Sequence, residues 1–288
     1  MFRSSEDALF VAGLRVFSAG AALVVVLIAI FLVRESTPAI EHIGIARIVG
    51  DASWHPNADA AAGRYNLLPM VLGTLLATAG ALLLAAPLGL ASALFCRYYA
   101  PPMMGRGYRR LVELIAGIPS VAYGFWGLVV LAPLVRAWHP PGQSLLAAVL
   151  ILAIMILPTI ALFADAALAA VPATYLHGAA ALGLPRWATI KGIALPAARS
   201  GLVTAILLAT GRALGETMAV LMVAGNVVQV PVSVFDPVRT LTANIALELG
   251  YAAGDHRAAL FVSGFILLAL TTLLVLLAKG LTRTNRHG

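Results

Sequence analysis

The chain has 288 residues, of which 61% are hydrophobic and only 11% are charged, whereas soluble domains carry about 25% charged residues. So few charged side chains cannot cover a water-facing surface, which excludes an ordinary soluble fold. The formal net charge of +7 would suit nucleic-acid binding only if the cations were clustered, so their positions must be compared with the apolar segments.

Six apolar segments divide the chain, and each is long enough to cross the ~30 Å hydrocarbon core of a membrane as an α-helix. They span 16–33, 67–96, 114–135, 145–164, 201–224 and 258–278. Because the segments do not alternate between apolar and polar residues, they do not fit the strands of a membrane barrel. We therefore expect an all-α integral membrane protein with six transmembrane helices in one domain, 16–278.

The first segment is followed by the polar run 34–38 (RESTP) and lacks the small-residue cleavage site of a signal peptide. We expect an uncleaved anchor helix with a polar loop directly after it. In the third and fourth segments, Pro119 and Pro158 each remove a backbone donor. Each proline predicts either an unwound turn beside a cavity or a tolerated kink in a packed helix.

The cationic residues are unequally divided between the two sides of the membrane that these segments define. One side carries twelve of them, before residue 16, in loops 97–113 and 165–200 and after residue 278, and the other side carries six. By the positive-inside rule the N-terminus 1–15 and the tail 279–288 are cytoplasmic. The basic balance therefore follows from topology and needs no nucleic acid as a partner. The twelve are Arg3, Arg15, Arg97, Arg106, Arg109, Arg110, Arg186, Lys191, Arg199, Lys279, Arg283 and Arg286.

Cysteine and histidine give no sign of a metal or redox centre. Cys96 is the only cysteine, and the six histidines lie apart, without the spacing of a metal-binding pair. The chain also lacks the G-x4-G-K-[ST] phosphate loop of ATP-binding proteins. We expect no metal, no cofactor and no catalytic residue in this chain.

The cytoplasmic loop 171–200 contains two short helical patterns. Thr174 can cap the first helix, Gly183 can end it in the left-handed conformation, and Pro185 can begin the second. This predicts a helix-turn-helix too short to span the membrane. Its apolar side chains are expected on the cytoplasmic surface: Tyr175, Leu182, Leu184, Trp187, Ile190 and Ile193.

Two interpretations fit this loop. It is either a pair of amphipathic helices on the membrane surface, with Trp187 as an interfacial anchor, or a docking element for a cytoplasmic protein. The spacing favours docking, because it resembles the coupling-loop signature of ABC importer permeases, E-A-A-x3-G-x9-I-x-L-P. The matching residues are Ala179, Gly183, Ile193, Leu195 and Pro196, whereas His177 and Gly178 replace the glutamate and the first alanine.

That resemblance implies a coupling loop, 174–196, that docks on a separate ATPase. The residues it assigns to ATPase coupling are Ala179, Ala180, Gly183, Leu184, Pro185, Arg186 and Trp187.

The fifth segment contains a charged pair. Arg212 lies near the middle of the bilayer, where a charge costs ~2.5–3.5 kcal/mol on the insertion scale. Its spacing of four residues from Glu216 predicts that the two side chains share a helix face and neutralise each other. Gly211 and Gly215 form a GxxxG pattern that lets another helix approach closely. The pair is either a structural ion pair or part of a substrate pathway. In a pathway, the guanidinium would bind an oxyanion, and the carboxylate would pair with the guanidinium when no anion is bound.

Three stretches resemble the PstC family of permease subunits of bacterial phosphate ABC importers, with a type I importer fold. They are GRALGETMAV at 211–220 followed by Gly225-Asn226, the run 113–127, and Trp54-His-Pro56 leading into 68–75. The resemblance covers roughly 40–270 and implies that Arg212 and Glu216 take part in phosphate passage.

By the same resemblance, the partners are a PstA-like second permease, a PstB-like ATPase dimer that binds ATP-Mg, a PstS-like extracytoplasmic phosphate-binding protein, inorganic phosphate and membrane lipid. The location is the bacterial cytoplasmic (inner) membrane. Two alternatives stay open: a permease for another oxyanion such as molybdate or sulfate, and an ion-coupled secondary transporter that uses Arg212 and Glu216 as a relay.

Overall fold

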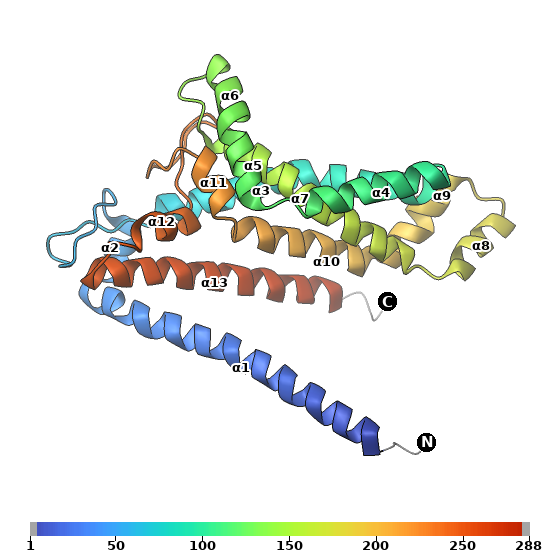
Figure 1. The fold of residues 1–288 in the computed structure, drawn as a ribbon, viewed down its shortest axis with the longest axis horizontal. Coiled ribbons are helices and arrows are strands. Elements are labelled where there is room, and N and C mark those ends of the chain that lie inside the picture. The colour runs from blue at the N-terminus through green and yellow to red at the C-terminus, as the bar shows by residue number, and fades with distance from the viewer. Residues whose placement is uncertain (1–4, 284–288) are drawn as a thin grey trace. The chain divides into compact units, whose positions relative to one another are not determined.

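The computed structural model describes residues 5–283, and Figure 1 shows their helices. Arg3 and Arg286, counted above for orientation, and the last five residues of the predicted tail lie outside the described residues. The α-helices are α1 (Ser5–His42), α2 (Ile45–Gly50), α3 (Leu68–Leu94), α4 (Pro102–Ala116), α5 (Ser120–Trp126), α6 (Ala132–Trp138), α7 (Leu145–Ala169), α8 (Ala173–Ala181), α9 (Arg186–Thr189), α10 (Leu195–Leu214), α11 (Met218–Val223), α12 (Leu241–Glu248) and α13 (Gly254–Arg283). Three π-helical turns extend them: η1 (Phe95–Tyr99), η2 (Gly127–Leu131) and η3 (Ile190–Ala194).

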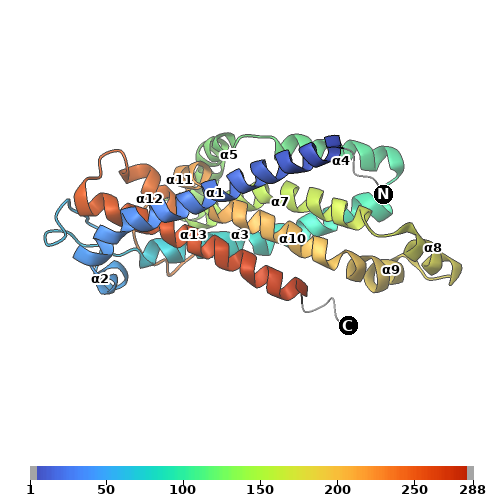
Figure 2. The same ribbon diagram turned by 90° about the horizontal axis from the view of Figure 1, so that it is seen from below.

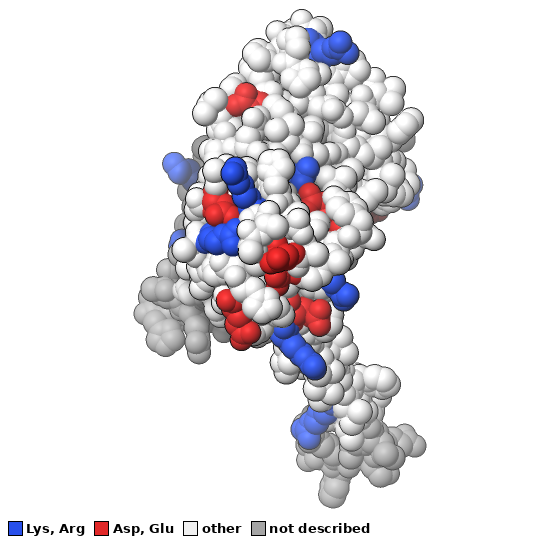
Figure 3. Space-filling model, turned by 90° about the vertical axis from the view of Figure 1, so that its left-hand side faces the viewer, with Lys and Arg blue, Asp and Glu red and all other residues white. Residues whose placement is uncertain are grey.

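Six helical segments are long and apolar enough to cross a membrane, and no strand forms between residues 5 and 283. The segments are Phe10–His42, Leu68–Tyr99, Ser120–Trp138, Leu145–Ala169, Arg186–Leu214 and Gly254–Leu277. This confirms the predicted all-α membrane fold with six helices. Figure 3 looks onto one end of these helices, where acidic and basic side chains lie near one another among residues of other kinds.

The chain forms two compact units, and each is described by itself. Unit 1 comprises the residues up to 66 together with 248–268, and unit 2 comprises 67–247 and the residues from 269 onward.

Unit 2 is built around α7, with α3 and α10 packed beside it (Figures 1 and 2). Helix α7 is apolar on all sides, as expected for a helix at the centre of a bundle. Small residues of the neighbouring helices allow the close approach: a Cβ at Gly80 would lie 2.7 Å from a Val149 methyl carbon, and one at Gly89 would lie 2.8 Å from an Ile160 methyl carbon. Such small residues are typical of helix interfaces in membranes.

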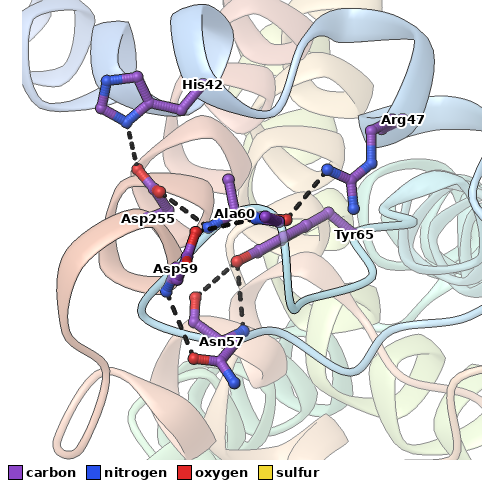
Figure 4. Close-up of polar contacts among 8 residues, drawn as sticks. His42, Arg47, Asn57, Asp59, Ala60, Tyr65 and Asp255 are labelled. Atoms are coloured by element: carbon purple, nitrogen blue, oxygen red, sulfur yellow. Dashed lines mark hydrogen bonds and ion pairs between the residues drawn. The ribbon is translucent and has the colours of Figure 1, made fainter.

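Unit 1 contains a polar network between α1, the loop before α3 and the start of α13 (Figure 4). The carboxylate of Asp255 lies 2.7 Å from His42 Nδ1 and accepts a 3.0 Å bond from the Ala60 amide. Tyr65 is buried, and its hydroxyl donates to the Asn57 carbonyl and accepts from the Asn57 amide. Burial raises the pKa of the Tyr65 hydroxyl because the phenolate would lose its hydration.

A second polar cluster in unit 1 is buried around Glu248. Its carboxylate accepts from Trp54 Nε1 and lies within hydrogen-bond distance of His256 Nε2, both at 2.9 Å. The Trp54 and Tyr65 rings meet edge to face, with centroids 6.1 Å apart. These contacts tie the loop before α3 to the start of α13.

The predicted polar loop directly after the first span is wrong. Helix α1 continues through Pro38 to His42. The hydroxyls of Ser36 and Thr37 donate to the carbonyls of Leu32 and Val33, at 2.6 and 2.9 Å. Because these polar side chains find acceptors within the helix itself, they do not end it.

The third span begins later than predicted: the range 114–135 crosses a break between α4 and the continuous helical segment Ser120–Trp138. Helix α4 ends at Ala116, and α5 begins after Pro119, whose ψ of 141° is extended. Pro119 therefore lies in the break and caps the start of α5, whereas Pro158 lies within the unbroken helix α7. The sequence analysis left the same two alternatives open for both prolines. Pro119 lies at a break in the helix, and Pro158 is tolerated within a packed helix.

Candidate functional site

The helix that carries Arg212 ends two residues later. Helix α10 stops at Leu214, Gly215 is its C-terminal cap, and α11 begins at Met218. The Gly215 amide donates to the Gly211 carbonyl at 3.1 Å, closing the last turn. The predicted continuous span over 201–224 is therefore interrupted at residues 215–217.

Glu216 lies in this break and is half-buried. Its carboxylate accepts a 3.0 Å hydrogen bond from the Ala219 amide in the first turn of α11. Its backbone carbonyl accepts a 2.8 Å bond from the Thr242 hydroxyl of α12. Both contacts hold the residue in place.

The predicted ion pair between Arg212 and Glu216 is wrong for this structure. The spacing of four residues brings two side chains together only on a continuous helix, and α10 ends between them. Arg212 is exposed, and its guanidinium makes no ion pair within the part of the chain that the structure describes.

Two of the family-like stretches pack directly on each other. A Cβ at Gly124 would lie 2.8 Å from the Ala219 Cα, and one at Gly127 would lie 2.8 Å from a Val223 methyl carbon. The run 113–127 therefore supports α11 through positions without side chains. Sequence reasoning did not assign this role to the glycines; their spacing of three residues was the available signal.

The face of α10 that carries the GxxxG pattern is open within the described part of unit 2. No atom lies within 4 Å of a Cβ built at Gly211, and only the Gly211 carbonyl, at 3.5 Å, lies near one at Gly215. Among the described helices of unit 2, none makes the close approach that the pattern predicts.

The cytoplasmic loop has the predicted turn at Gly183. Helix α8 ends with Leu182 as its cap, and Gly183 has a φ of +69°. The Leu184 amide donates to the Ala179 carbonyl at 3.1 Å, and the Gly183 amide donates to the Ala180 carbonyl at 3.0 Å. This pair of bonds is a Schellman motif, in which glycine tolerates the left-handed conformation.

The two predicted helix starts have different outcomes. Pro185 is the N-terminal cap of α9, as expected. Thr174 is not a cap, because α8 begins at Ala173 with Pro172 in the cap position. Helix α9 is also not a separate short helix, since it continues through η3 into α10. The helix-turn-helix is thus joined without interruption to the span that carries Arg212.

Most of the residues assigned to docking are exposed, including Trp187 at 58%, and Leu182, expected on the same surface, is 80% exposed. Ala180, Gly183, Leu184, Pro185 and Arg186 are exposed as well. Three residues depart from the expectation: Ile190, expected on the surface, is 1% exposed, Ile193 is half-buried, and Ala179 is 2% exposed. Ala179 and Ile190 are buried where α8 packs against η3.

The part of the chain that the structure describes contains no group of three or more His, Cys, Asp or Glu side chains placed to hold a metal ion.

Known proteins resemble this chain over most of its length. The sequence pattern of the family described as binding-protein-dependent transport system inner membrane component matches residues 85–287. The phosphate transport system permease protein PstC of Mesorhizobium japonicum is 36% identical, over 95% of this chain and 89% of that protein. The probable ABC transporter permease protein YqgH of Bacillus subtilis is 38% identical, over 81% of this chain and 76% of that protein.

The fold is similar to that of a solved structure of the MetNI methionine ABC transporter in an inward-facing conformation. The TM-score is 0.58 at 19% sequence identity, over 76% of this chain and 93% of that chain.

Proposed function

This chain belongs to the family of binding-protein-dependent transport system inner membrane components, and from this premise we propose that it is the permease subunit of an ATP-driven importer of inorganic phosphate. The observation that carries the proposal is the similarity to PstC of Mesorhizobium japonicum over 95% of this chain. Further PstC proteins, from Haemophilus influenzae and Mycobacterium tuberculosis, are 33% and 32% identical. The chain is a multi-pass transport subunit of the bacterial inner membrane.

Arg212 is the residue that best suits a phosphate pathway. A guanidinium presents a planar fork of donors that matches two oxygens of a phosphate. In this chain it is exposed and lacks a carboxylate partner among residues 5–283. An unpaired charge within a span is expensive in lipid, so Arg212 fits a water-filled cavity closed by a second permease. Glu216 would border the same cavity at the helix break.

Docking of an ATPase on the coupling loop supplies the energy in this proposal. The exposed residues that would enter the ATPase surface are Ala180, Gly183, Leu184, Pro185, Arg186 and Trp187. Ala179 would contribute by letting α8 pack closely on η3. ATP-Mg would bind to that partner, because this chain lacks the phosphate loop.

A continuous helix links the docking surface with the pathway. The segment Arg186–Leu214 has 29 residues and begins in the exposed turn that would contact the ATPase. At 1.5 Å per residue it extends for roughly 40 Å and includes Arg212 in its last turn. Movement of the coupling loop would therefore displace the pathway residue through one rigid element.

The remaining components follow from the same family. A PstA-like permease would supply the other half of the pathway, a PstB-like ATPase dimer would drive it, and a PstS-like extracytoplasmic binding protein would deliver phosphate. Both termini would be cytoplasmic, as the charge distribution indicates. Affinity for phosphate would reside mainly in the binding protein, since one arginine contributes only part of a phosphate site.

Uptake of labelled phosphate by phosphate-starved cells tests the proposal. Cells that lack this chain are complemented with the wild type or with Arg212→Gln, and sulfate and molybdate uptake are measured in parallel. Selective loss of energy-dependent phosphate uptake without the chain is the expected result. Loss of sulfate or molybdate uptake instead would show that the transported anion is sulfate or molybdate and not phosphate. Unchanged uptake of all three anions, in cells without another phosphate importer, would overturn the assignment.

The Arg212→Gln variant separates a pathway role from a packing role. Because Arg212 makes no ion pair within the described residues, we expect the variant to assemble normally and to lose phosphate uptake. Copurification of the ATPase and the second permease measures assembly. Loss of assembly would show that Arg212 serves packing between subunits.

A further inference from the structure

A second group of arginines lies in unit 2, around the buried carboxylate of Asp165 in α7. Arg97 Nε lies 3.1 Å from Asp165 Oδ1, and Arg109 Nη1 lies 2.9 Å from Asp165 Oδ2. Arg97 also donates to the Asp165 carbonyl at 3.2 Å. One carboxylate thus joins η1, α4 and α7, with both of its oxygens occupied.

These residues line an open pocket in which the arginines outnumber the carboxylates. The lining consists of Cys96, Arg97, Pro102, Gly105, Arg106, Arg109 and Asp165. Three arginines against one aspartate leave an excess of two positive charges. Glu113, which lies 3.2 Å from Arg109 but does not line the pocket, lowers the local excess to one.

Arg106 supplies the available charge. Its Nε donates to the Pro102 carbonyl at 3.2 Å, and its guanidinium makes no ion pair among residues 5–283. Arg97 and Arg109, by contrast, already share the carboxylate of Asp165. The pocket therefore combines two arginines held in place with one that has free donors.

The surroundings of the pocket indicate a membrane surface. Helix α4 carries the basic residues Arg106, Arg109 and Arg110, and it also exposes Met103 and Leu114, at 83% and 72%. Exposed apolar residues beside a basic pocket fit the boundary between acyl chains and headgroups. The charge distribution places this end of α4 on the cytoplasmic side.

We propose that this pocket binds a phosphate group, supplied either by the headgroup of an anionic phospholipid or by free orthophosphate. Arg106 would bind the phosphate oxygens, and Arg97 and Arg109 would add positive potential from fixed positions. The site is formed by η1, α4 and α7 and does not include Arg212, so it is a different site from the proposed transport pathway.

The native cysteine provides a direct readout. Cys96 is the only cysteine in the chain, it is partly exposed, and it lines the pocket. A bound phosphate group should shield its thiol from iodoacetamide. The alkylation rate of the Cys96 peptide is measured by mass spectrometry in the assembled complex, reconstituted in lipid nanodiscs.

Two arms distinguish the source of the phosphate group. In the first, phosphatidylglycerol replaces part of the phosphatidylcholine in the discs. In the second, orthophosphate is added to discs of phosphatidylcholine alone. The test variant is Arg106→Gln, and the matched control is Arg110→Gln, which removes an exposed arginine of the same helix that does not line the pocket.

We expect protection of Cys96 in at least one arm, with the half-protecting concentration raised about tenfold by Arg106→Gln, the factor for one charge-assisted hydrogen bond. Arg110→Gln should leave that concentration unchanged. Protection by phosphatidylglycerol identifies a lipid headgroup, and protection by orthophosphate identifies the free anion. Absence of protection in both arms, or equal effects of the two variants, would overturn the proposal. Phosphate uptake is not part of the readout, so a failure here is distinct from a failure of the transport assignment.

Discussion

Two glycines of the coupling loop, five residues apart, should respond to alanine in opposite ways. Gly178 lies inside α8 in an ordinary helical conformation, and Gly183 follows the helix with a φ of +69°. A Cβ at either position would meet no atom within 4 Å, so steric clash does not contribute. Only the backbone conformation distinguishes the two sites, which makes each the control for the other.

The magnitudes follow from that difference. Alanine at Gly178 stabilises a helix interior by about 1 kcal/mol. Alanine at Gly183 must adopt the left-handed conformation at a cost of about 1–2 kcal/mol, of which about 0.4–1 kcal/mol is offset by the reduced freedom of the unfolded chain. The two variants should therefore differ by about 2 kcal/mol, roughly a 30-fold difference in the local opening equilibrium of α8.

Hydrogen exchange of the backbone amides measures this opening in the assembled complex. The informative amides are those of Leu182, Gly183 and Leu184, which close the end of α8. Exchange should slow in Gly178→Ala and accelerate in Gly183→Ala. Gly183→Asn should lie between Gly183→Ala and the wild type, because asparagine tolerates the left-handed conformation. Exchange that shifts in the same direction in both alanine variants would refute the argument.

The Gly183 variants should follow the same order in their binding to the ATPase as in hydrogen exchange. If the turn at Gly183 presents the docking residues, copurification of the ATPase should decrease from wild type to Gly183→Asn to Gly183→Ala. Gly178→Ala should retain it. Equal copurification in all four proteins, despite altered exchange, would separate the turn from docking.

Substitutions elsewhere test the packing and the electrostatics of the two units. Gly124→Ala places a Cβ 2.8 Å from a backbone carbon of α11 and should destabilise the complex by about 1–3 kcal/mol. The control is Gly20→Ala, whose Cβ meets no atom within 4 Å, and equal melting temperatures of the two variants would contradict the expectation. The raised pKa of Tyr65 stabilises the folded chain up to about pH 10, and this contribution is lost as the pH rises through the folded pKa. Tyr65→Phe should therefore lower the free energy of unfolding by about 1–2 kcal/mol at pH 8. The variant should also lose less thermal stability than the wild type between pH 9 and 11, and an equal loss in both proteins would show that Tyr65 does not cause the decline. Asp165→Asn leaves two partly exposed arginines without their shared carboxylate. It should lower the free energy of unfolding in chemical denaturation by about 1–2 kcal/mol, a value reduced for solvent screening. A free energy equal to that of the wild type would show that the cluster contributes nothing to folding.

The six membrane helices could be predicted because hydropathy is a local property that adds up along each segment. The helix ends could not, since they depend on individual side chains and their acceptors. Ser36 and Thr37 are polar, yet both bond to carbonyls of their own helix and extend it. Pro119 is exposed in the break before α5, whereas Pro158 is buried within α7, where neighbouring helices cover it.

The turn at Gly183 was predictable because its cause is local: one residue type suits the left-handed conformation after a helix. The cluster around Asp165 was not, because Arg97 lies 68 residues away and their contact depends on how α3 and α7 pack. A lone aspartate at the end of an apolar segment was the only signal. It shows that a buried charge needs a partner but not which arginine provides it.

The separation of Arg212 from Glu216 has an energetic consequence for anion binding. If the two side chains formed an ion pair, an incoming phosphate would have to displace the carboxylate before it could reach the guanidinium. In this structure the carboxylate is bonded to the Ala219 amide instead, so the arginine is available without that competition. Its charge must then be hydrated in the absence of phosphate, because lipid would not tolerate it unpaired. In the proposed pathway, hydration rather than a carboxylate would offset the charge of Arg212, and phosphate would not have to displace Glu216 from it.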